Sequence, residues 1–412
     1  MTFEIQTANP QPTHDRERID SLDILRGFAL LGILVMNIQS FGMPVNAYLI
    51  PNSYGDLDGI NGLVWLIGFL FFDLKFMAMF SMMFGAGIIL FTDNRDARKQ
   101  PVLRVHYRRM FLLLVFGLIH AYVIWHGDIL VAYAICGMWV VWVRKWSPKG
   151  LLITGVLFFI IGSLFHIVVG LSTQYFPETA EQLRADFALS ASEQRSEIES
   201  FQGSWRNHLP IRMKEAASIQ FFVFPFMFFW RISGLMLIGM ALYKWKVLNA
   251  SRPSRFYKKL AVIGGGLGLP IVAGGAYLDH TKNFDPAFLL GYGAIPNWYG
   301  SLSVALMWIA IIMLIAQSNK FPRIKHALSA YGRLAFTNYI GQSILATWVF
   351  YGYGLALMGT LDRLQQVGIV IIIWTVQLII SVYWVRYFRF GPLEWIWRSG
   401  VYMRPQPMRR KT

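Results

Sequence analysis

The chain has 412 residues, of which 55% are hydrophobic and only 15% charged, and it carries 15 Trp and 32 Phe. A soluble protein of this length cannot bury so much apolar surface, so the composition excludes the soluble classes and predicts an all-α integral membrane protein. The net charge of +16 falls in loops between apolar runs, which favours the lipid bilayer over nucleic acid as a partner. The single Cys136 excludes a disulfide framework and a Cys-based zinc site, and no metal site is expected.

Apolar runs in the first half of the chain predict five membrane spans. They follow a polar N-terminal tail, residues 1–22, and cover residues 23–42, 76–91, 110–124, 129–143 and 151–171. Before the second span, residues 59–72 are also apolar and predict an extra interfacial or partly inserted helix. Residues 23–171 are therefore expected to form an N-terminal transmembrane bundle.

The second half begins with the longest polar segment, residues 172–218, which predicts an extracytoplasmic insert with helical character. Five further apolar runs then predict spans at residues 219–243, 260–278, 298–317, 334–353 and 367–387. Residues 219–390 would form a C-terminal transmembrane bundle, and residues 391–412 a cytoplasmic interfacial helix and basic tail. No internal repeat is visible in the sequence.

The charged loops alternate as a membrane topology requires. Basic residues concentrate in four loops and in the tails, and these loops cover residues 95–109, 144–149, 244–259 and 320–333. The loops between them hold few Lys or Arg, at residues 43–58, 125–128, 279–297 and 354–363. About ten spans, with both termini in the cytoplasm, satisfy every loop at once.

One hairpin, residues 117–133, carries the sharpest candidate for chemistry. His120 lies in its first arm, Asp128 opens the second arm, and Tyr133 follows just over one helical turn later. A carboxylate beside an imidazole orients it and raises its basicity, as general-base catalysis requires. Asn37 of the first span is expected at the same depth. We predict His120 as general base or acyl carrier, oriented by Asp128, with Asn37 and Tyr133 positioning an acceptor or stabilising an oxyanion.

A structural role is the alternative for the same histidine. Lone histidines within membrane spans often form hydrogen bonds between helices, so His120 can be explained without catalysis. His126 lies in the short link of the hairpin and is expected to be solvated.

Five further polar residues are candidates for substrate or donor binding. Asp73 and Lys75 either contribute to a site on the outer side or simply pair with each other. Arg231 stands near the middle of its span, where an unpaired arginine costs about 2.5 kcal/mol or more. It is predicted to clamp an anionic donor or to form a structural ion pair. Asn338 and Gln342 share a helix face at i, i+4 and either line a substrate path or join helices.

Motifs spread along nearly the whole chain carry a family resemblance. They are Leu22-Asp23-Ile-Leu-Arg26-Gly27, Asn37, Lys75-Phe-Met, Phe84-Gly85-Ala86-Gly87, His120, Gly127-Asp128-Ile-Leu, Tyr133, Gly332-Arg333, Thr337-Asn338-Tyr339, Gln342-Ser343 and Gly391-Pro392-Leu-Glu394-Trp395 with Arg398. On these motifs the chain resembles the YeiB-like family of bacterial multi-pass proteins, a domain family of unknown function.

The Leu-Asp-x-x-Arg-Gly opening also resembles, more distantly, the membrane acyltransferases that include heparan-α-glucosaminide N-acetyltransferase. The resemblance implies transfer of an acyl group from a cytoplasmic thioester, with acyl-CoA as co-substrate and no tightly bound cofactor, to an acceptor on the far side. In that enzyme the active histidine closely follows the matching first helix. Here no histidine occurs between His14 and His106, so His120 would take that role from another helix.

The leading hypothesis is therefore an acyltransferase-like membrane enzyme acting on a small-molecule donor and acceptor, as a single chain or a homo-oligomer. A transporter or permease for a small metabolite, with the same polar groups lining a path, is the alternative, and a ligand-binding sensor is a third. The absence of a repeat and the gathering of polar groups in the outer layer favour the enzyme over the transporter.

Overall fold

The computed structural model describes residues 20–410, and this part of the chain is helical, without a β-strand. Within it, eight helices are long and apolar enough to cross a membrane. This finding confirms an α-helical, multi-pass membrane protein. Most of the predicted N-terminal tail, residues 1–19, and the last two residues of the C-terminal tail lie outside the described residues.

The eight candidate spans in residues 20–410 are five single helices and three composite ones. They are α1 (Asp20–Gly42), α3 with α4 (Gly59–Phe71 and Lys75–Ala97), α5 with the π-helix η2 (Val102–Ile119 and His120–Ile124), α7 (Pro148–Tyr175), α10 with the π-helix η4 and α11 (Leu209–Ser218, Ile219–Phe228 and Phe229–Lys244), α12 (Ser254–Thr281), α14 (Ala294–Gln317) and α17 (Arg363–Tyr387).

Two of the ten predicted spans are shorter than a full crossing. They are α6 with the 3-10 turn η3 (Leu130–Val140 and Val141–Val143) and α16 (Ala335–Phe350). A helix of 16 residues, such as α16, is only about 24 Å long at the helical rise. These two helices carry Tyr133, Asn338 and Gln342, so predicted site residues lie on the short helices of the bundle.

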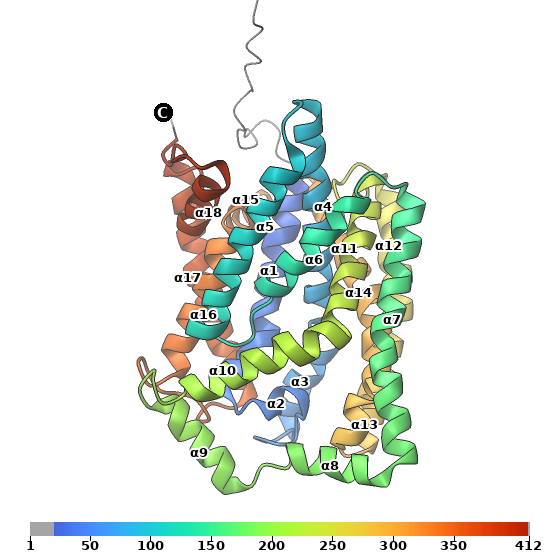
Figure 1. The fold of residues 1–412 in the computed structure, drawn as a ribbon, viewed down its shortest axis with the longest axis vertical. Helices are drawn as coiled ribbons and strands as arrows, with labels where there is room; N and C mark the ends of the chain where they lie inside the picture. The colour runs from blue at the N-terminus through green and yellow to red at the C-terminus, as the bar shows by residue number, and fades with distance from the viewer. Residues whose placement is uncertain (1–19, 411–412) are drawn as a thin grey trace, which may run out of the picture.

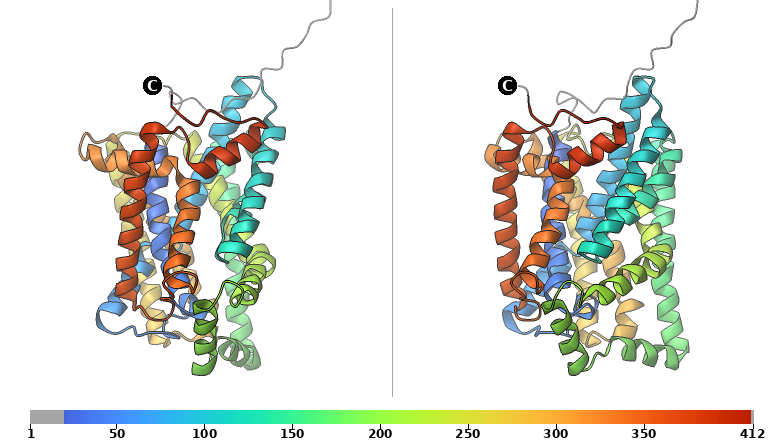
Figure 2. Two further views of the ribbon diagram at one scale, coloured as in Figure 1. Left: turned by 90° about the vertical axis from the view of Figure 1, so that its left-hand side faces the viewer. Right: turned by 60° about the vertical axis from the view of Figure 1, so that its left-hand side comes forward.

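The remaining helices lie at the two ends of the molecule or link the longer ones. They are α2 (Asn46–Leu49), α8 (Pro177–Phe187), α9 (Ala191–Gln202), α13 (Pro286–Leu290), α15 (Pro322–Arg333) and α18 (Pro392–Tyr402). Figures 1 and 2 show α18 across the upper end of the bundle, with α8 and α9 at the opposite end. The carboxylate of Glu394 in α18 accepts hydrogen bonds from the amides of Phe336 and Thr337, and so caps the start of α16.

Helix α1 forms the centre of the bundle, in contact with α4, α14, α15, α16 and α17. Glycines allow the closest helix crossings. A Cβ on Gly332 of α15 would lie 2.0 Å from the carbonyl oxygen of Asp23 in α1. At the crossing of α4 and α11, a Cβ on Gly85 would lie 2.0 Å from the Met236 carbonyl oxygen, and one on Gly239 would lie 1.9 Å from that of Met82. Small residues at these positions let backbones touch, as in other membrane bundles.

The long apolar region before residue 97 divides as expected. Helix α3 ends at Phe71, and α4 begins at Lys75 after Leu74, whose φ of 59° is left-handed. An L-residue in that conformation interrupts a right-handed helix. The break places Asp73 in the turn between the helices and Lys75 at the first position of α4.

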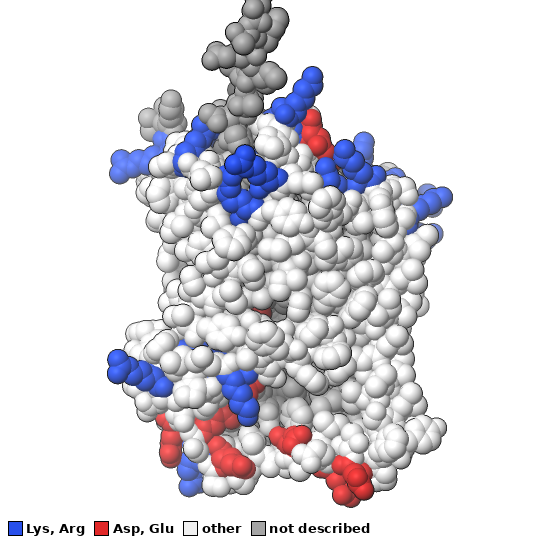
Figure 3. Space-filling model, viewed as in Figure 1, with Lys and Arg blue, Asp and Glu red and all other residues white. Residues whose placement is uncertain are grey.

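Charge separates along the long axis of the molecule. On the face in Figure 3, Lys and Arg gather at the upper end, acidic and basic side chains mix at the lower end, and a broad band between them is almost free of charge. The upper end holds α18 and the start of α1 (Figure 1), so the two described ends of the chain lie on the same side. A cytoplasmic position for this upper end stays a prediction from the positive-inside rule.

Cysteine labelling in intact cells tests this topology. After Cys136, which is buried, is replaced by alanine, we expect an impermeant thiol reagent to label Ser192→Cys but not Ala97→Cys. Both positions are exposed and lie at opposite ends of the molecule. Labelling of Ala97→Cys before the cells are permeabilised would reverse the orientation.

Candidate functional site

The hairpin forms a close pair of helices with a wide final turn in its first arm. Helix α5 passes into the π-helix η2 at His120, and the Trp125 amide donates to the His120 carbonyl oxygen at 2.8 Å. The arms approach at Gly117, where a Cβ would lie 2.6 Å from the Val131 amide nitrogen. A glycine is therefore required there. π-Turns often occur at functional sites because they re-aim side chains.

Three side chains form a continuous chain of hydrogen bonds beside this turn. His120 Nδ1 lies 2.7 Å from Asp128 Oδ2, and His120 Nε2 lies 2.9 Å from Ser343 Oγ. The second carboxylate oxygen of Asp128 accepts from the Val131 amide at 2.8 Å. His120, Ser343 and Asp128 are only 1%, 2% and 8% exposed, respectively. This is the connectivity of a carboxylate–imidazole–hydroxyl triad.

Ser343 was not among the residues predicted from sequence. It comes from α16, whereas the other two members lie in the hairpin more than 200 residues earlier. In the sequence, only the motif Gln342-Ser343 pointed to this serine. Tyr339 lies one turn before Ser343 on the same helix face. The Tyr339 ring lies 5.2 Å from the His120 ring, and its hydroxyl accepts from the Ile129 amide at 3.3 Å.

Asn338 and Gln342 are buried in a network that joins helices. Gln342 donates to the Leu30 carbonyl oxygen at 3.0 Å and to the Tyr331 hydroxyl at 2.9 Å. Asn338 donates to the Tyr331 carbonyl oxygen at 3.1 Å and to Ser381 at 3.0 Å. These bonds connect α16 to α1, α15 and α17. Lining a substrate path stays a prediction for both residues.

The other two predicted catalytic residues, Tyr133 and Asn37, form no hydrogen bond with the side chains of the triad. The hydroxyls of Tyr133 and Ser81 are 3.1 Å apart, which joins α6 to α4. Asn37 is half-buried on α1, and its side chain forms no hydrogen bond with the described residues. Positioning of an acceptor stays a prediction for both.

Asp73 and Lys75 meet through an amide on α14 rather than pairing directly, which corrects the simple pairing considered from sequence. The Asn297 amide donates to Asp73 at 2.7 Å, and its oxygen accepts from the Lys75 ammonium. The Tyr48 hydroxyl donates to the second Asp73 oxygen at 2.8 Å. Because the left-handed turn at Leu74 separates the two side chains, a third group can lie between them. The predicted outer layer thus divides into two separate clusters.

Arg231 belongs to this second cluster. Its guanidinium lies 4.4 Å from the Trp298 ring centroid, and it donates to the Ser301 hydroxyl at 2.7 Å. It is fully buried and forms no direct ion pair with a carboxylate in residues 20–410, although the Asp73 charge acts on it. Aromatic faces and a hydroxyl take the place of the predicted structural ion pair. The role of donor clamp stays a prediction.

Arg231→Lys separates the structural role from the donor-binding role. We expect a lower unfolding temperature in detergent, because an ammonium lacks the planar face that stacks on Trp298. The control is Arg206→Lys, at an exposed position. If stability is unchanged and only the KM for an acyl donor rises, the stacking interpretation is wrong.

His126 is buried, contrary to the expectation that it is solvated. It is 6% exposed, because α10 lies across the lower end of the hairpin (Figure 1). Trp205, just before α10, donates to the Val123 carbonyl oxygen at 3.0 Å and so fastens this cover to η2. The segment predicted as an external insert therefore helps to enclose the candidate site.

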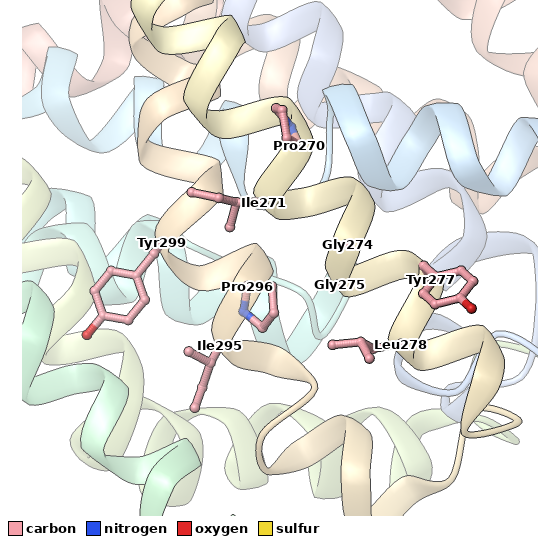
Figure 4. A pocket seen from close by; sticks show the side chains of 9 residues that line it. All are labelled: Pro270, Ile271, Gly274, Gly275, Tyr277, Leu278, Ile295, Pro296 and Tyr299. Carbon is pink, nitrogen blue, oxygen red and sulfur yellow. The ribbon is translucent and has the colours of Figure 1, made fainter.

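The rest of the described chain offers little competing chemistry. Residues 20–410 contain no group of three or more His, Cys, Asp or Glu side chains that could hold a metal ion. A groove between α12 and α14 (Figure 4) is lined almost entirely by apolar side chains. Its lining residues include no carboxylate, imidazole or amine, so the groove supplies no acid or base.

Comparison with known proteins gives relatives over the whole length but no described activity. A family model described as "Protein of unknown function (DUF418)" matches residues 242–404. The chain is 31% identical to the uncharacterized protein YeiB of Escherichia coli (strain K12), over 96% of this chain and 99% of that protein. It is 30% identical to the uncharacterized protein YxaH of Bacillus subtilis (strain 168), over 98% of each chain. No solved structure matches.

Proposed function

The chain belongs to the YeiB-like DUF418 family of uncharacterized proteins, and we propose that it is a membrane acyltransferase whose reaction centre is Asp128–His120–Ser343. The observation that supports this proposal is the unbroken line of hydrogen bonds from carboxylate to imidazole to hydroxyl. A histidine that only joins two helices needs neither the carboxylate behind it nor the serine in front.

In the proposed first step, His120 Nε2 takes the proton of the Ser343 hydroxyl, and the oxygen attacks the carbonyl carbon of an acyl thioester. Asp128 holds the imidazole by its Nδ1–H and stabilises the imidazolium. The carbon–sulfur bond then breaks, and the departing thiolate receives the proton from His120. Ser343 is left as an acyl ester.

In the second step, a hydroxyl or amine of the acceptor gives its proton to His120 and attacks the ester carbonyl. The ester bond to Ser343 breaks, and its oxygen regains the proton from His120, so the enzyme is restored. Negative charge develops on the carbonyl oxygen in both steps and needs a donor. The Trp125 indole nitrogen is buried without a partner, and its ring lies 6.2 Å from the His120 ring, which makes it a candidate.

The proposed orientation has a cytoplasmic thioester as donor and an acceptor from the far side of the bacterial cytoplasmic membrane. Burial of all three side chains excludes bulk water, which would otherwise hydrolyse the acyl ester. The enclosing α10 lies on the acceptor side in this orientation.

A thiol-release assay tests the proposal. Purified protein in detergent is given acyl-CoA donors of several chain lengths and a panel of hydroxyl and amine acceptors, and free thiol is followed with time. We expect acceptor-dependent thiol release that Ser343→Ala removes. Donors that stay intact, together with substrate-dependent flux in liposomes, would favour a transporter instead.

A further inference from the structure

A second set of buried polar side chains lies where α10 crosses the hairpin. Arg212 and His208 are both 0% exposed. The two terminal guanidinium nitrogens of Arg212 and both ring nitrogens of His208 have no hydrogen-bond partner among the described residues. Buried polar groups are nearly always satisfied, and an unpaired buried cation is especially costly. So many free donors in one place indicate a missing anionic partner.

The contacts of Arg212 leave its two terminal guanidinium nitrogens free to donate hydrogen bonds. Its Nε donates to the Tyr122 carbonyl oxygen at 3.1 Å, and its guanidinium lies 4.7 Å from the Trp205 ring centroid. These contacts use one edge and one face of the group. The two terminal nitrogens remain as a planar pair of donors, which matches the two oxygens of a carboxylate or phosphate.

His208 is held by aromatic rings instead of hydrogen bonds. It stacks on Phe201 at a centroid distance of 5.0 Å and lies 5.0 Å from the Tyr351 ring. Burial and, to a smaller extent, the nearby Arg212 charge lower the pKa of His208 to about 4. His208 is therefore neutral at pH 7 and has one N–H to donate, while Arg212 supplies the charge.

The nearby carboxylates do not neutralise Arg212. Glu197 on α9 accepts from the Val45 amide at 2.9 Å instead. No carboxylate within residues 20–410 forms an ion pair with Arg212, and its charge instead acts on His126 and His208. An anion from outside the chain is the partner that this arrangement fits.

We propose that Arg212 and His208 receive an oxyanion, a carboxylate or phosphate, carried by the acyl acceptor. This assignment rests on the proposed function, because it names the class of acceptor for the same hairpin. Arg212 donates to the carbonyl oxygen of Tyr122, two residues after His120. An acceptor anchored at Arg212 therefore holds its hydroxyl or amine close to the general base.

Binding of inorganic phosphate, measured by calorimetry on the full chain in a neutral detergent, tests the site. We expect wild type to bind phosphate and Arg212→Gln to bind it about tenfold more weakly or worse, the loss expected for a charge-assisted contact. Arg206→Gln, at an exposed position on the same segment, should bind like wild type. Equal binding by wild type and Arg212→Gln would overturn the proposal.

His208→Phe provides a second variant in case Arg212→Gln does not fold. Phenylalanine keeps the stack on Phe201 and removes both nitrogens, so we expect normal folding with several-fold weaker phosphate binding. Unchanged phosphate binding in His208→Phe would remove His208 from the site and contradict the assignment.

The source of the anion is distinguished in vesicles. If the phosphate belongs to a lipid headgroup, phosphatidylglycerol vesicles should raise the unfolding temperature of wild type but not of Arg212→Gln, relative to phosphatidylcholine vesicles. If it belongs to a soluble acceptor, inorganic phosphate alone should do so in detergent. If the unfolding temperatures of wild type and Arg212→Gln respond equally in vesicles and in detergent with phosphate, no anion binds at Arg212, and the proposal is overturned.

Failure of the acyltransferase function would look different. Phosphate binding that depends on Arg212, in a protein that releases no thiol, supports the anion site and removes the acyl chemistry. Thiol release with a KM for anionic acceptors that is the same in wild type and Arg212→Gln overturns the anion site and keeps the chemistry.

Discussion

Ser343→Ala, His120→Ala and Asp128→Asn are each expected to reduce acyl transfer by about 10⁴-fold, the loss typical of triad members, while the protein still folds. Asn at position 128 can still accept the hydrogen bond from the Val131 amide, so the hairpin keeps its cap. It can no longer hold the imidazole in the required tautomer. Purified variants in detergent, assayed for thiol release at equal folded concentration, provide the measurement.

The three changes should not add, because the residues act as one unit. The His120→Ala, Ser343→Ala double variant should therefore be no slower than either single variant. Ser381→Ala is the matched control, since Ser381 is a buried serine that only accepts a helix-joining bond from Asn338. If His120→Ala loses stability and keeps its activity per folded molecule, His120 only joins helices.

Gly85→Ala is expected to destabilise the bundle by about 3 kcal/mol or more, the upper part of the range for overpacking. The new methyl group would lie 2.0 Å from the Met236 carbonyl oxygen, and backbone cannot move aside as a flexible side chain can. Helices α4 and α11 would have to separate along their whole crossing. The unfolding midpoint and the monodisperse fraction in detergent measure the effect.

Gly87 provides the control on the same helix. A Cβ at that position meets nothing within 4 Å, so Gly87→Ala should keep or raise stability, by up to about 1 kcal/mol from helix propensity. Equal stability of the two variants would contradict the close crossing of α4 and α11.

Hydropathy predicted most spans within a few residues, because the apolar length of a helix is set by the membrane and can be read locally. The last predicted span, residues 367–387, corresponds to α17 (Arg363–Tyr387). The sixth predicted span, residues 219–243, differs from the structure. Residues 209–218 are polar and were assigned to the insert, yet the helix continues from Leu209 through Pro225 in the π-helix η4 to Lys244. Polarity alone does not reveal that α10 packs on the hairpin.

The candidate site, too, could be predicted from the sequence only in part. His120 and Asp128 could be paired from sequence, since a short hairpin brings nearby residues together. Ser343 could not, because only the packing of α16 against η2 places it at the imidazole. The burial of His126 and of Arg212 likewise depends on the path of α10. Contacts between segments that are far apart in the sequence are set by tertiary packing, which the patterns of a single sequence do not reveal.

Mass spectrometry of the acyl-enzyme tests the central claim most directly. Wild-type protein incubated with acyl-CoA in the absence of acceptor should gain the mass of one acyl group on the peptide that contains Ser343. His120→Ala should gain none, and added acceptor should remove the group from wild type. An acyl group on another residue, or an unmodified wild-type protein that still releases thiol, would contradict transfer through Ser343.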